Sequence, residues 1–280
     1  MKSITQEVND FINRSVDSHV RVAVTGLSRA GKTAFISSLV NQLLHTSTHD
    51  NLPLLVSARD KRLVGAKREP QANMMVPRFA YDEAMEHVFT QPPKWPEPTR
   101  DVSEIRLAVK YKPTRKSKKL FGSTSTLHID IIDYPGEWLL DLPLLDMSFH
   151  EWSQTQFGAL KGQRGELAQE WLAKLEQLNL ADDVNERELE AIAQSYTQYL
   201  HDCKDAGLHW VQPGRFVLPG ELEGAPVLQF FPCRFDKESK ASKDSNLAML
   251  KARYQEYQQK VVKAFYLSLI HISEPTRQIR

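Results

Sequence analysis

The sequence predicts an α/β fold in which a small β-sheet domain is followed by a large all-helical insertion. A β-rich run at residues 20–24 leads through a glycine-containing loop into a helical pattern at 32–45. Apolar and polar residues alternate at 103–111, and an apolar run at 127–132 can return beside that segment as a hairpin. Beyond Pro143 the spacing of apolar residues is helical over most of the remaining chain.

The expected domain boundaries follow from where these patterns change. We expect the sheet domain at residues 1–146, the helical insertion lobe at 147–266 and a tail at 267–280. Prolines interrupt the middle of the sheet domain apart from one helical piece near 82–88. Helical spacing in the lobe covers four segments, which are 147–160, 164–178, 184–205 and 243–265.

Composition places the chain among ordinary globular proteins. Apolar residues make up 41% and charged residues 25%, and the net charge of +1 excludes a global electrostatic attraction to nucleic acid. Cys203 and Cys233 lack metal-ligand spacing, which indicates unpaired thiols in a reducing compartment. The sequence contains no run of about 18 apolar residues and no signal-peptide pattern, so we expect a cytoplasmic protein. An amphipathic helical pattern at 3–17 leaves peripheral membrane contact as an open alternative.

The strongest motif is the loop at residues 26–33, G-L-S-R-A-G-K-T, a full match to G-x-x-x-x-G-K-[ST]. Its glycines let backbone N–H groups curl around phosphate oxygens, and the start of the following helix adds partial positive charge. We expect Lys32 to reach the β- and γ-phosphates and the Thr33 hydroxyl to bind Mg²⁺. The loop therefore predicts binding of a nucleoside triphosphate. The predicted contacts are Gly26, Leu27, Ser28, Arg29, Ala30, Gly31, Lys32, Thr33 and Ala34.

A second motif, D-Y-P-G at residues 133–136, follows the second apolar strand pattern. A carboxylate at the end of a strand beside the loop can hold Mg²⁺ through water, which makes Asp133 a metal-ligand candidate. The N–H of Gly136 can approach the γ-phosphate closely, which predicts a nucleotide-binding and catalytic role for this glycine. Asp130 is a competing carboxylate, but it lies in the middle of the strand and is not followed by the glycine.

Several further residues each have two interpretations. Glu137 is either a catalytic residue that positions water or an exposed or helix-capping acid. Thr99 is either a third Mg²⁺ ligand on a mobile segment or a turn residue after proline. Arg29 either approaches phosphate or is an exposed loop residue. A basic hairpin tip at 112–119 is either a solvated turn or a contact for an acidic partner or anionic lipid.

With these motifs in view, the chain resembles the YcjX family of bacterial P-loop proteins, from the N-terminus to about Tyr266. Besides the 26–33 loop, three stretches carry the resemblance: W-P-E-P-T-R-D-V-S-E-I-R-L at 95–107, D-Y-P-G-E-W-L-L-D-L-P-L-L at 133–145 and Q-P-G-R-F-V-L-P-G at 212–220. The resemblance implies a Ras-like GTPase core with a large helical insertion and an association with stress response. It also implies GTP or GDP as the nucleotide, with Thr99 and residues 133–136 as functional positions beside the loop.

The chain departs from the family pattern in two ways. Family members are longer and contain a [NT]-K-x-D motif whose aspartate pairs with guanine, and this chain has no such motif. We therefore expect an incomplete sheet with an exposed apolar edge and a loss of guanine selectivity. Residues 267–280 resemble the translation of a transposon adapter used in sequencing libraries, which predicts a truncated reading frame. The alternative for this tail is a β-strand at 267–272 followed by a turn.

Together these patterns favour a GTP-binding protein whose intact form hydrolyses GTP with Mg²⁺ as a stress-related switch. The predicted catalytic residues are Lys32, Gly136 and Glu137, and the predicted metal ligands are Thr33, Thr99 and Asp133. The expected partners are guanine nucleotide and an unidentified protein, with no nucleic acid. One alternative is a P-loop kinase or ATPase that uses the same loop, and another is an interaction module in which the nucleotide is structural.

Overall fold

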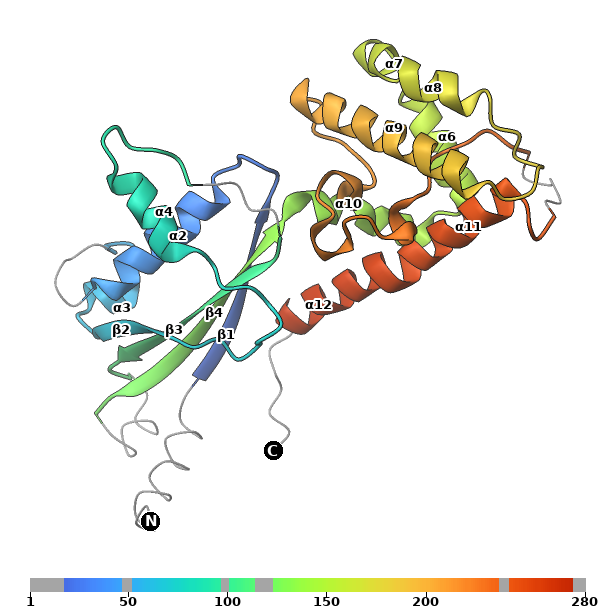
Figure 1. Cartoon of the computed structure of the whole chain (residues 1–280). Coiled ribbons are helices and arrows are strands. Elements are labelled where there is room, and N and C mark those ends of the chain that lie inside the picture. The colour runs from blue at the N-terminus through green and yellow to red at the C-terminus, as the bar shows by residue number, and fades with distance from the viewer. Residues whose placement is uncertain (1–17, 47–51, 97–100, 114–122, 237–241, 274–280) are drawn as a thin grey trace, which may run out of the picture. The chain divides into compact units, whose positions relative to one another are not determined.

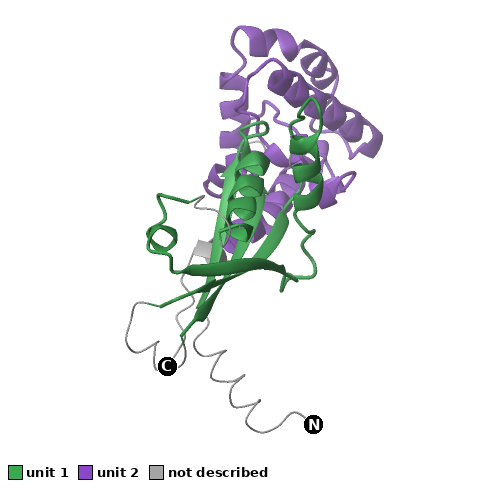
Figure 2. Ribbon diagram, turned by 90° about the vertical axis from the view of Figure 1, so that its left-hand side faces the viewer, with its two compact units in different colours: residues 1–134, 272–280 green, residues 135–271 purple. Residues whose placement is uncertain are grey.

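The computed structural model describes residues 18–46, 52–96, 101–113, 123–236 and 242–273 (Figure 1). The chain divides into two compact units, which Figure 2 colours separately. Unit 1 comprises Met1–Tyr134 with Ile272–Arg280, and unit 2 comprises Pro135–His271. Three sequence predictions lie outside the described residues: the helix at 3–17, the Mg²⁺ ligand Thr99 and the basic residues at 115–119.

Unit 1 contains a four-stranded sheet with the strand order β1-β4-β3-β2. The strands are β1 (Ser18–Gly26), β2 (Leu63–Glu69), β3 (Ser103–Tyr111) and β4 (Ser125–Pro135). β3 is antiparallel to both of its neighbours, and Ser103 lies opposite Asp133. The predicted hairpin of residues 103–111 and 127–132 is therefore confirmed.

The described helices of unit 1 are α2 (Lys32–Leu44), α3 (Val56–Arg59) and α4 (Tyr81–Phe89). On α2, Ile36, Val40 and Leu43 are buried at the spacing of one helix face. This face packs into one apolar cluster with alternate residues of β3 and β4, among them Leu107 and Ile131. The helical patterns predicted at 32–45 and 82–88 are confirmed.

The two edges of the described sheet are β2 and β1. β2 was not predicted from the sequence, because its residues L-V-G-A-K-R-E include a glycine and three consecutive charges. An edge strand tolerates such residues because one side of its backbone has no strand partner. On β1, the apolar residues Val20 and Val22 are exposed.

Unit 2 is helical in its described residues, and its longer helices begin at polar N-cap residues. Ser148 and Glu151 form a capping box on α6, while the side chains of Asn185 and Ser245 cap α9 and α11. The elements are η1 (Gly136–Asp146), α6 (Phe149–Gly158), α7 (Gln163–Leu167), α8 (Gln169–Leu175), α9 (Glu186–Asp205), α10 (Gly214–Val217), η2 (Gly220–Leu222), η3 (Pro226–Leu228), α11 (Asn246–Glu256), η4 (Tyr257–Val262) and α12 (Lys263–Ser273). The last two residues of α12 are assigned to unit 1.

The four helical segments predicted in the lobe are confirmed, with two refinements. The segment predicted at 164–178 is two helices, α7 and α8, and the segment predicted at 243–265 continues through the π-helical turn η4 into α12. The alternative of a β-strand at 267–272 is wrong, because these residues belong to α12. None of the described helices is both long enough and apolar enough to cross a membrane.

Aromatic side chains make up much of the core of unit 2. The rings of Trp152 and Phe230 meet edge to face with their centroids 5.3 Å apart, and Trp152 stacks on Tyr254 at 5.3 Å. Cys203 and Cys233 are free and buried, as expected for unpaired thiols.

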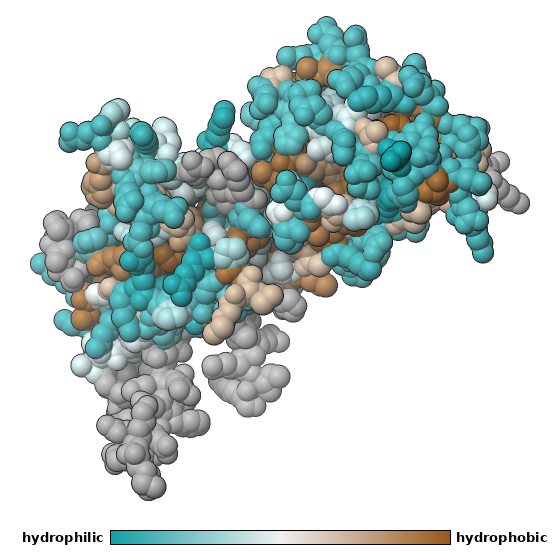
Figure 3. All heavy atoms as spheres, in the orientation of Figure 1, coloured by the Kyte–Doolittle hydropathy of each residue, from teal (hydrophilic) through white to brown (hydrophobic). Residues whose placement is uncertain are grey.

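The surface over α7, α8 and α9 that faces the viewer in Figure 3 is mostly hydrophilic. The apolar residues of these helices are therefore directed into the core of unit 2.

The contacts of η1 explain why the chain divides into its two units between Tyr134 and Pro135. The boundary expected from the sequence was at residue 146. The Arg215 guanidinium lies 3.2 Å from the centre of the Trp138 ring, whose Nε1 donates to the carbonyl oxygen of Leu218 at 2.9 Å. Asp141 accepts hydrogen bonds from the backbone N–H of Gly214 at 2.8 Å and from the Tyr257 hydroxyl at 2.5 Å. These contacts attach the segment after Pro135 to the helices of unit 2.

Burial of Asp141 gives unit 2 a specific pH dependence. Desolvation raises the pKa of Asp141 to about 6, although hydrogen bonds from Tyr257, Gly214 and Arg215 favour its charged form. Because the folded pKa lies above the unfolded one, the proton on Asp141 stabilises the folded state at low pH. This contribution, about 3 kcal/mol, is lost as pH rises from about 4 through about 6.

We expect Asp141→Asn to remove this part of the pH dependence. The free energy of unfolding, measured by urea denaturation at about pH 4 and about pH 7, should change less with pH in the variant than in the parent chain. Glu223→Gln, which neutralises an exposed carboxylate of the same unit, should keep the parent's pH dependence. Equal pH dependence in Asp141→Asn and the parent would contradict the prediction.

Candidate functional site

The 26–33 loop connects β1 to α2 and contains two residues with left-handed backbone conformations. The φ angle is 65° at Arg29 and 86° at Gly31, and Gly31 is the N-cap of α2. The backbone N–H of Ala30 donates to the carbonyl oxygen of Leu27 at 3.1 Å, which closes a turn. Left-handed residues within a turn build the backbone concavities that bind anions. The loop therefore contains a turn and two left-handed residues of the kind found in such concavities.

The Lys32 side chain supplies a buried cation to this loop. Its ammonium group donates to the carbonyl oxygens of Gly26 at 2.5 Å and of Leu27 at 3.3 Å. A Cβ added at Gly26 would lie 3.6 Å from Cγ of Lys32 and 3.4 Å from Cβ of Ala30. A Cβ at position 26 would therefore make only ordinary van der Waals contacts with the lysine stem. The charge of Lys32 lies against the loop backbone.

Thr33 and Ala34 follow Lys32 in the first turn of α2. The 13-residue helix begins at Lys32, within the last residues of the loop motif, and the N–H of Phe35 donates to the carbonyl oxygen of Gly31 at 2.9 Å. The partial positive charge of a helix N-terminus is therefore located at the loop. Arg29 is exposed in the loop.

Asp133 lies near the carboxyl end of β4, on the strand beside β1. Figure 1 shows β1 and β4 running in the same direction, so their carboxyl ends meet at the same edge of the sheet. Alternate residues of β4, among them Ile129 and Ile131, belong to the cluster around α2, and Asp133 continues this alternation. The carboxylate is buried, with 1% of the residue exposed. The structure therefore places Asp133 on the α2 face, at the edge where the loop begins.

Asp130 extends from the opposite face of the sheet and is held in ion pairs. Arg106 donates to both carboxylate oxygens, at 2.6 and 2.8 Å, and Nε2 of His19 lies 2.6 Å from Oδ2. Burial alone raises the pKa of Asp130, but hydrogen bonds from Arg106 and His19 hold it below its ordinary value. Both carboxylate oxygens of Asp130 are therefore engaged by Arg106 and His19 on that face. Asp133 is for this reason the better carboxylate candidate for the site.

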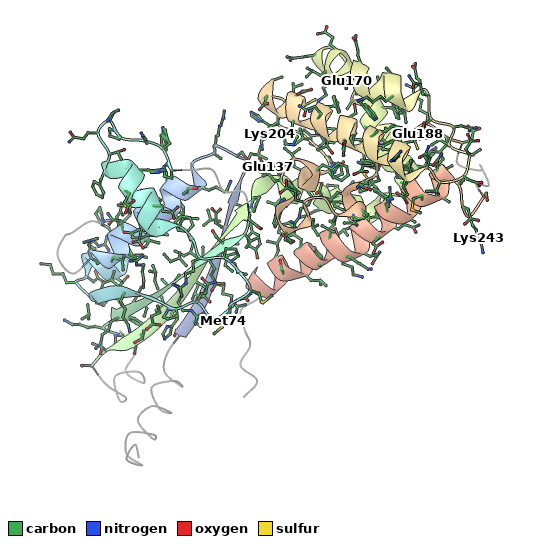
Figure 4. All side chains as sticks on the ribbon, viewed as in Figure 1. Met74, Glu137, Glu170, Glu188, Lys204 and Lys243 are labelled. Atoms are coloured by element: carbon green, nitrogen blue, oxygen red, sulfur yellow. The ribbon has the colours of Figure 1, made fainter. Side chains whose placement is uncertain are left out.

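Gly136 and Glu137 begin η1 and belong to unit 2. The interpretation of Glu137 as an exposed acid is wrong, since only 2% of the residue is exposed. Its Oε1 lies 3.0 Å from Nζ of Lys204 in α9, and Figure 4 shows the two residues next to each other. Glu137 is thus a buried carboxylate in an ion pair.

Two residues that lie against Glu137 were not predicted from the sequence. Lys204 lies far from the motifs in sequence, and no local pattern distinguishes it from other helix lysines. Gly214 approaches the backbone closely, because a Cβ added there would lie 1.9 Å from the carbonyl oxygen of Glu137. The available signal for Gly214 was its position in the 212–220 stretch that resembles the YcjX family.

Comparison with known proteins identifies the family. Residues 20–279 match the model of the YcjX-like family (DUF463), so the match extends past Tyr266, where we expected the resemblance to end. The chain is 49% identical over 285 residues to the "Ras-like GTPase YcjX" of Escherichia coli K12, an alignment that covers 100% of this chain and 61% of that protein. It is 44% identical over 284 residues to the protein of the same name from Shewanella oneidensis, covering 95% of this chain and 58% of the relative. The chain thus spans about three fifths of the curated relatives that it matches. It belongs to the YcjX-like family.

Proposed function

We propose that this chain binds a guanine nucleotide with Mg²⁺ at the 26–33 loop, and that the full-length protein hydrolyses GTP. The observation that carries the proposal is the location of the loop, buried Lys32 and Asp133 at one edge of the sheet in unit 1. The name "Ras-like GTPase" of both relatives supports guanine as the base and hydrolysis as the reaction. The family resemblance extends the proposal to a stress-related switch with a protein partner.

In this proposal the protein contributes positioning and charge neutralisation. The loop N–H groups and Lys32 hold the phosphates, and the N–H of Gly136 approaches the γ-phosphate. Asp133 and the Thr33 hydroxyl, with Thr99, supply oxygen donors of the kind that Mg²⁺ prefers. When bound, Mg²⁺ would neutralise charge on the β- and γ-phosphates. Glu137 would act on water only if its carboxylate became available to the nucleotide.

Binding of the fluorescent nucleotide mant-GDP to the 280-residue chain tests this proposal. We expect saturable binding in the presence of Mg²⁺, weakened about tenfold or more when EDTA removes the metal. GTP and ATP should displace the probe within about threefold of each other, because the chain lacks the [NT]-K-x-D motif. Absence of saturable binding would contradict the proposed site.

The same competition separates the alternatives when it is carried out on a full-length family member. A GTPase should be displaced far better by GTP than by ATP, since a site built to hydrogen-bond guanine leaves polar groups unpaired with adenine. Equal displacement in the full-length protein would favour the kinase or ATPase alternative. A strong preference for GTP in the 280-residue chain would show that guanine recognition does not depend on that motif.

A further inference from the structure

The proposed nucleotide site depends on how two neighbouring strands of unit 1 are aligned. The 26–33 loop follows β1, whereas Asp133 belongs to β4. β1 is an edge of the described sheet, so one side of its backbone has no strand partner among the described residues. Its first half also has little apolar burial, since residues 19–23 are all exposed. Side-chain contacts between β1 and β4 therefore help to fix where the loop begins relative to Asp133.

Asp130 is the residue of β4 that makes such contacts. Nε2 of His19 lies 2.6 Å from its Oδ2, and Nε of Arg21 lies 3.7 Å from the same oxygen. From the position directly opposite on β3, Arg106 donates to both carboxylate oxygens at 2.6 and 2.8 Å. The residue is buried, with 1% exposed. One buried anion thus binds side chains of β1 and β3 at the same time.

The electrostatics of this sheet face concentrate negative charge on Asp130. Burial raises the pKa of Glu104, which lies two residues before Arg106 on β3, and the charge of Asp130 raises it further. Burial also raises the pKa of Asp130, but hydrogen bonds from Arg106 and His19 bring it below its ordinary value. Asp130 is therefore the stronger acid of these two buried carboxylates and the anion that holds β1 and β3.

We infer that Asp130 is a positioning residue for the proposed site, because it holds β1 in register with β4. Asp133 follows three residues later on the same strand, at about 10 Å. The carboxylate therefore joins the strand that ends at the loop to the strand that carries the metal-ligand candidate. It acts from the sheet face opposite to the site. The inference rests on the proposed function and identifies a residue outside the site on which Mg²⁺ binding depends.

Mg²⁺ is the ligand that depends most on this alignment. Phosphate contacts come from the loop and the first turn of α2, which are continuous in sequence. Mg²⁺ needs oxygen donors from both strands, since Thr33 follows β1 and Asp133 belongs to β4. A change in register should therefore weaken nucleotide binding in Mg²⁺ more than binding without metal. Unfolding, in contrast, would lower the bound fraction in both conditions alike.

The test measures the Kd of mant-GDP in Mg²⁺ and in EDTA for the 280-residue chain and its variants. The parent should bind about tenfold or more tightly in Mg²⁺. The double variant His19→Ala with Arg21→Ala removes the β1 side of the contact and leaves Arg106 paired with Asp130. Its ratio of the two Kd values should fall to about threefold or less. Asp130→Asn breaks the same contact from β4 and should lower the ratio to the same range.

Arg68→Ala with Asp82→Ala is the matched control, because it removes an exposed ion pair of 2.8 Å between β2 and α4 in the same unit. Its ratio should equal that of the parent. A parent-like ratio in either folded variant of the Asp130 contact would overturn the inference, and so would equal losses of affinity in Mg²⁺ and in EDTA. If Asp130→Asn does not fold, the double variant decides, because Arg106 keeps its buried carboxylate paired. A parent chain that does not bind mant-GDP, or binds it no better in Mg²⁺, would instead reject the proposed function.

Discussion

Replacing Lys32 with alanine is expected to weaken nucleotide binding by about a hundredfold or more. The ammonium group lies against the carbonyl oxygens of Gly26 and Leu27, so the cation of the site is part of the loop. Two charge-assisted hydrogen bonds to phosphate together contribute about 3 kcal/mol, which corresponds to a factor of about a hundred in Kd. Titration of mant-GDP with Mg²⁺ measures the change.

Arg29→Asn is the control for this variant, because it removes a different cation from the same loop. Arg29 is exposed and has a φ of 65°, a conformation that asparagine tolerates better than most residues do. We expect its Kd to change by less than about fivefold, as for an exposed ionic contact. Equal losses in both variants would support the alternative in which Arg29 contacts phosphate. Undiminished binding by Lys32→Ala would contradict the proposed site.

Replacing Gly214 with alanine is expected to destabilise unit 2 by about 3 kcal/mol. The added Cβ would lie 1.9 Å from the carbonyl oxygen and 2.5 Å from the carbonyl carbon of Glu137. Both are backbone atoms, so relief requires α10 and η1 to separate. Separation would weaken the hydrogen bond from the Gly214 N–H to Asp141 and the Arg215 contact with Trp138. Urea denaturation followed by tryptophan fluorescence measures the loss of stability.

Gly158→Ala makes the same chemical change at a position with room for it. Gly158 ends α6, and a Cβ added there meets no atom within 4 Å outside its own helix and its chain neighbours. Its free energy of unfolding should stay the same or rise by about 0.5 kcal/mol, since alanine has the higher helix propensity. A Gly214→Ala variant as stable as Gly158→Ala would show that η1 and α10 are not packed as described.

Local sequence patterns were sufficient to predict the elements that depend on neighbouring residues. Helical and alternating patterns located α2, β3, β4 and the long helices of unit 2, because amphipathic periodicity is set by residues a few positions apart. The same holds for the 26–33 loop, where Gly31 occupies a left-handed position that starts α2. Asp133 was preferred to Asp130 from the sequence through the glycine that follows it. Nucleotide contacts at these residues stay predictions.

The surroundings of Glu137 and the contacts that hold the segment after Gly136 could not be predicted without the three-dimensional structure. The sequence allowed a catalytic, capping or exposed acid at this position, whereas the structure shows a buried ion pair with Lys204 and a backbone contact at Gly214. The strand β2, with its charged edge sequence, also became visible only through its pairing with β3. The reason is physical: burial and ion pairing depend on groups brought together from distant parts of the chain, and no local spacing records them.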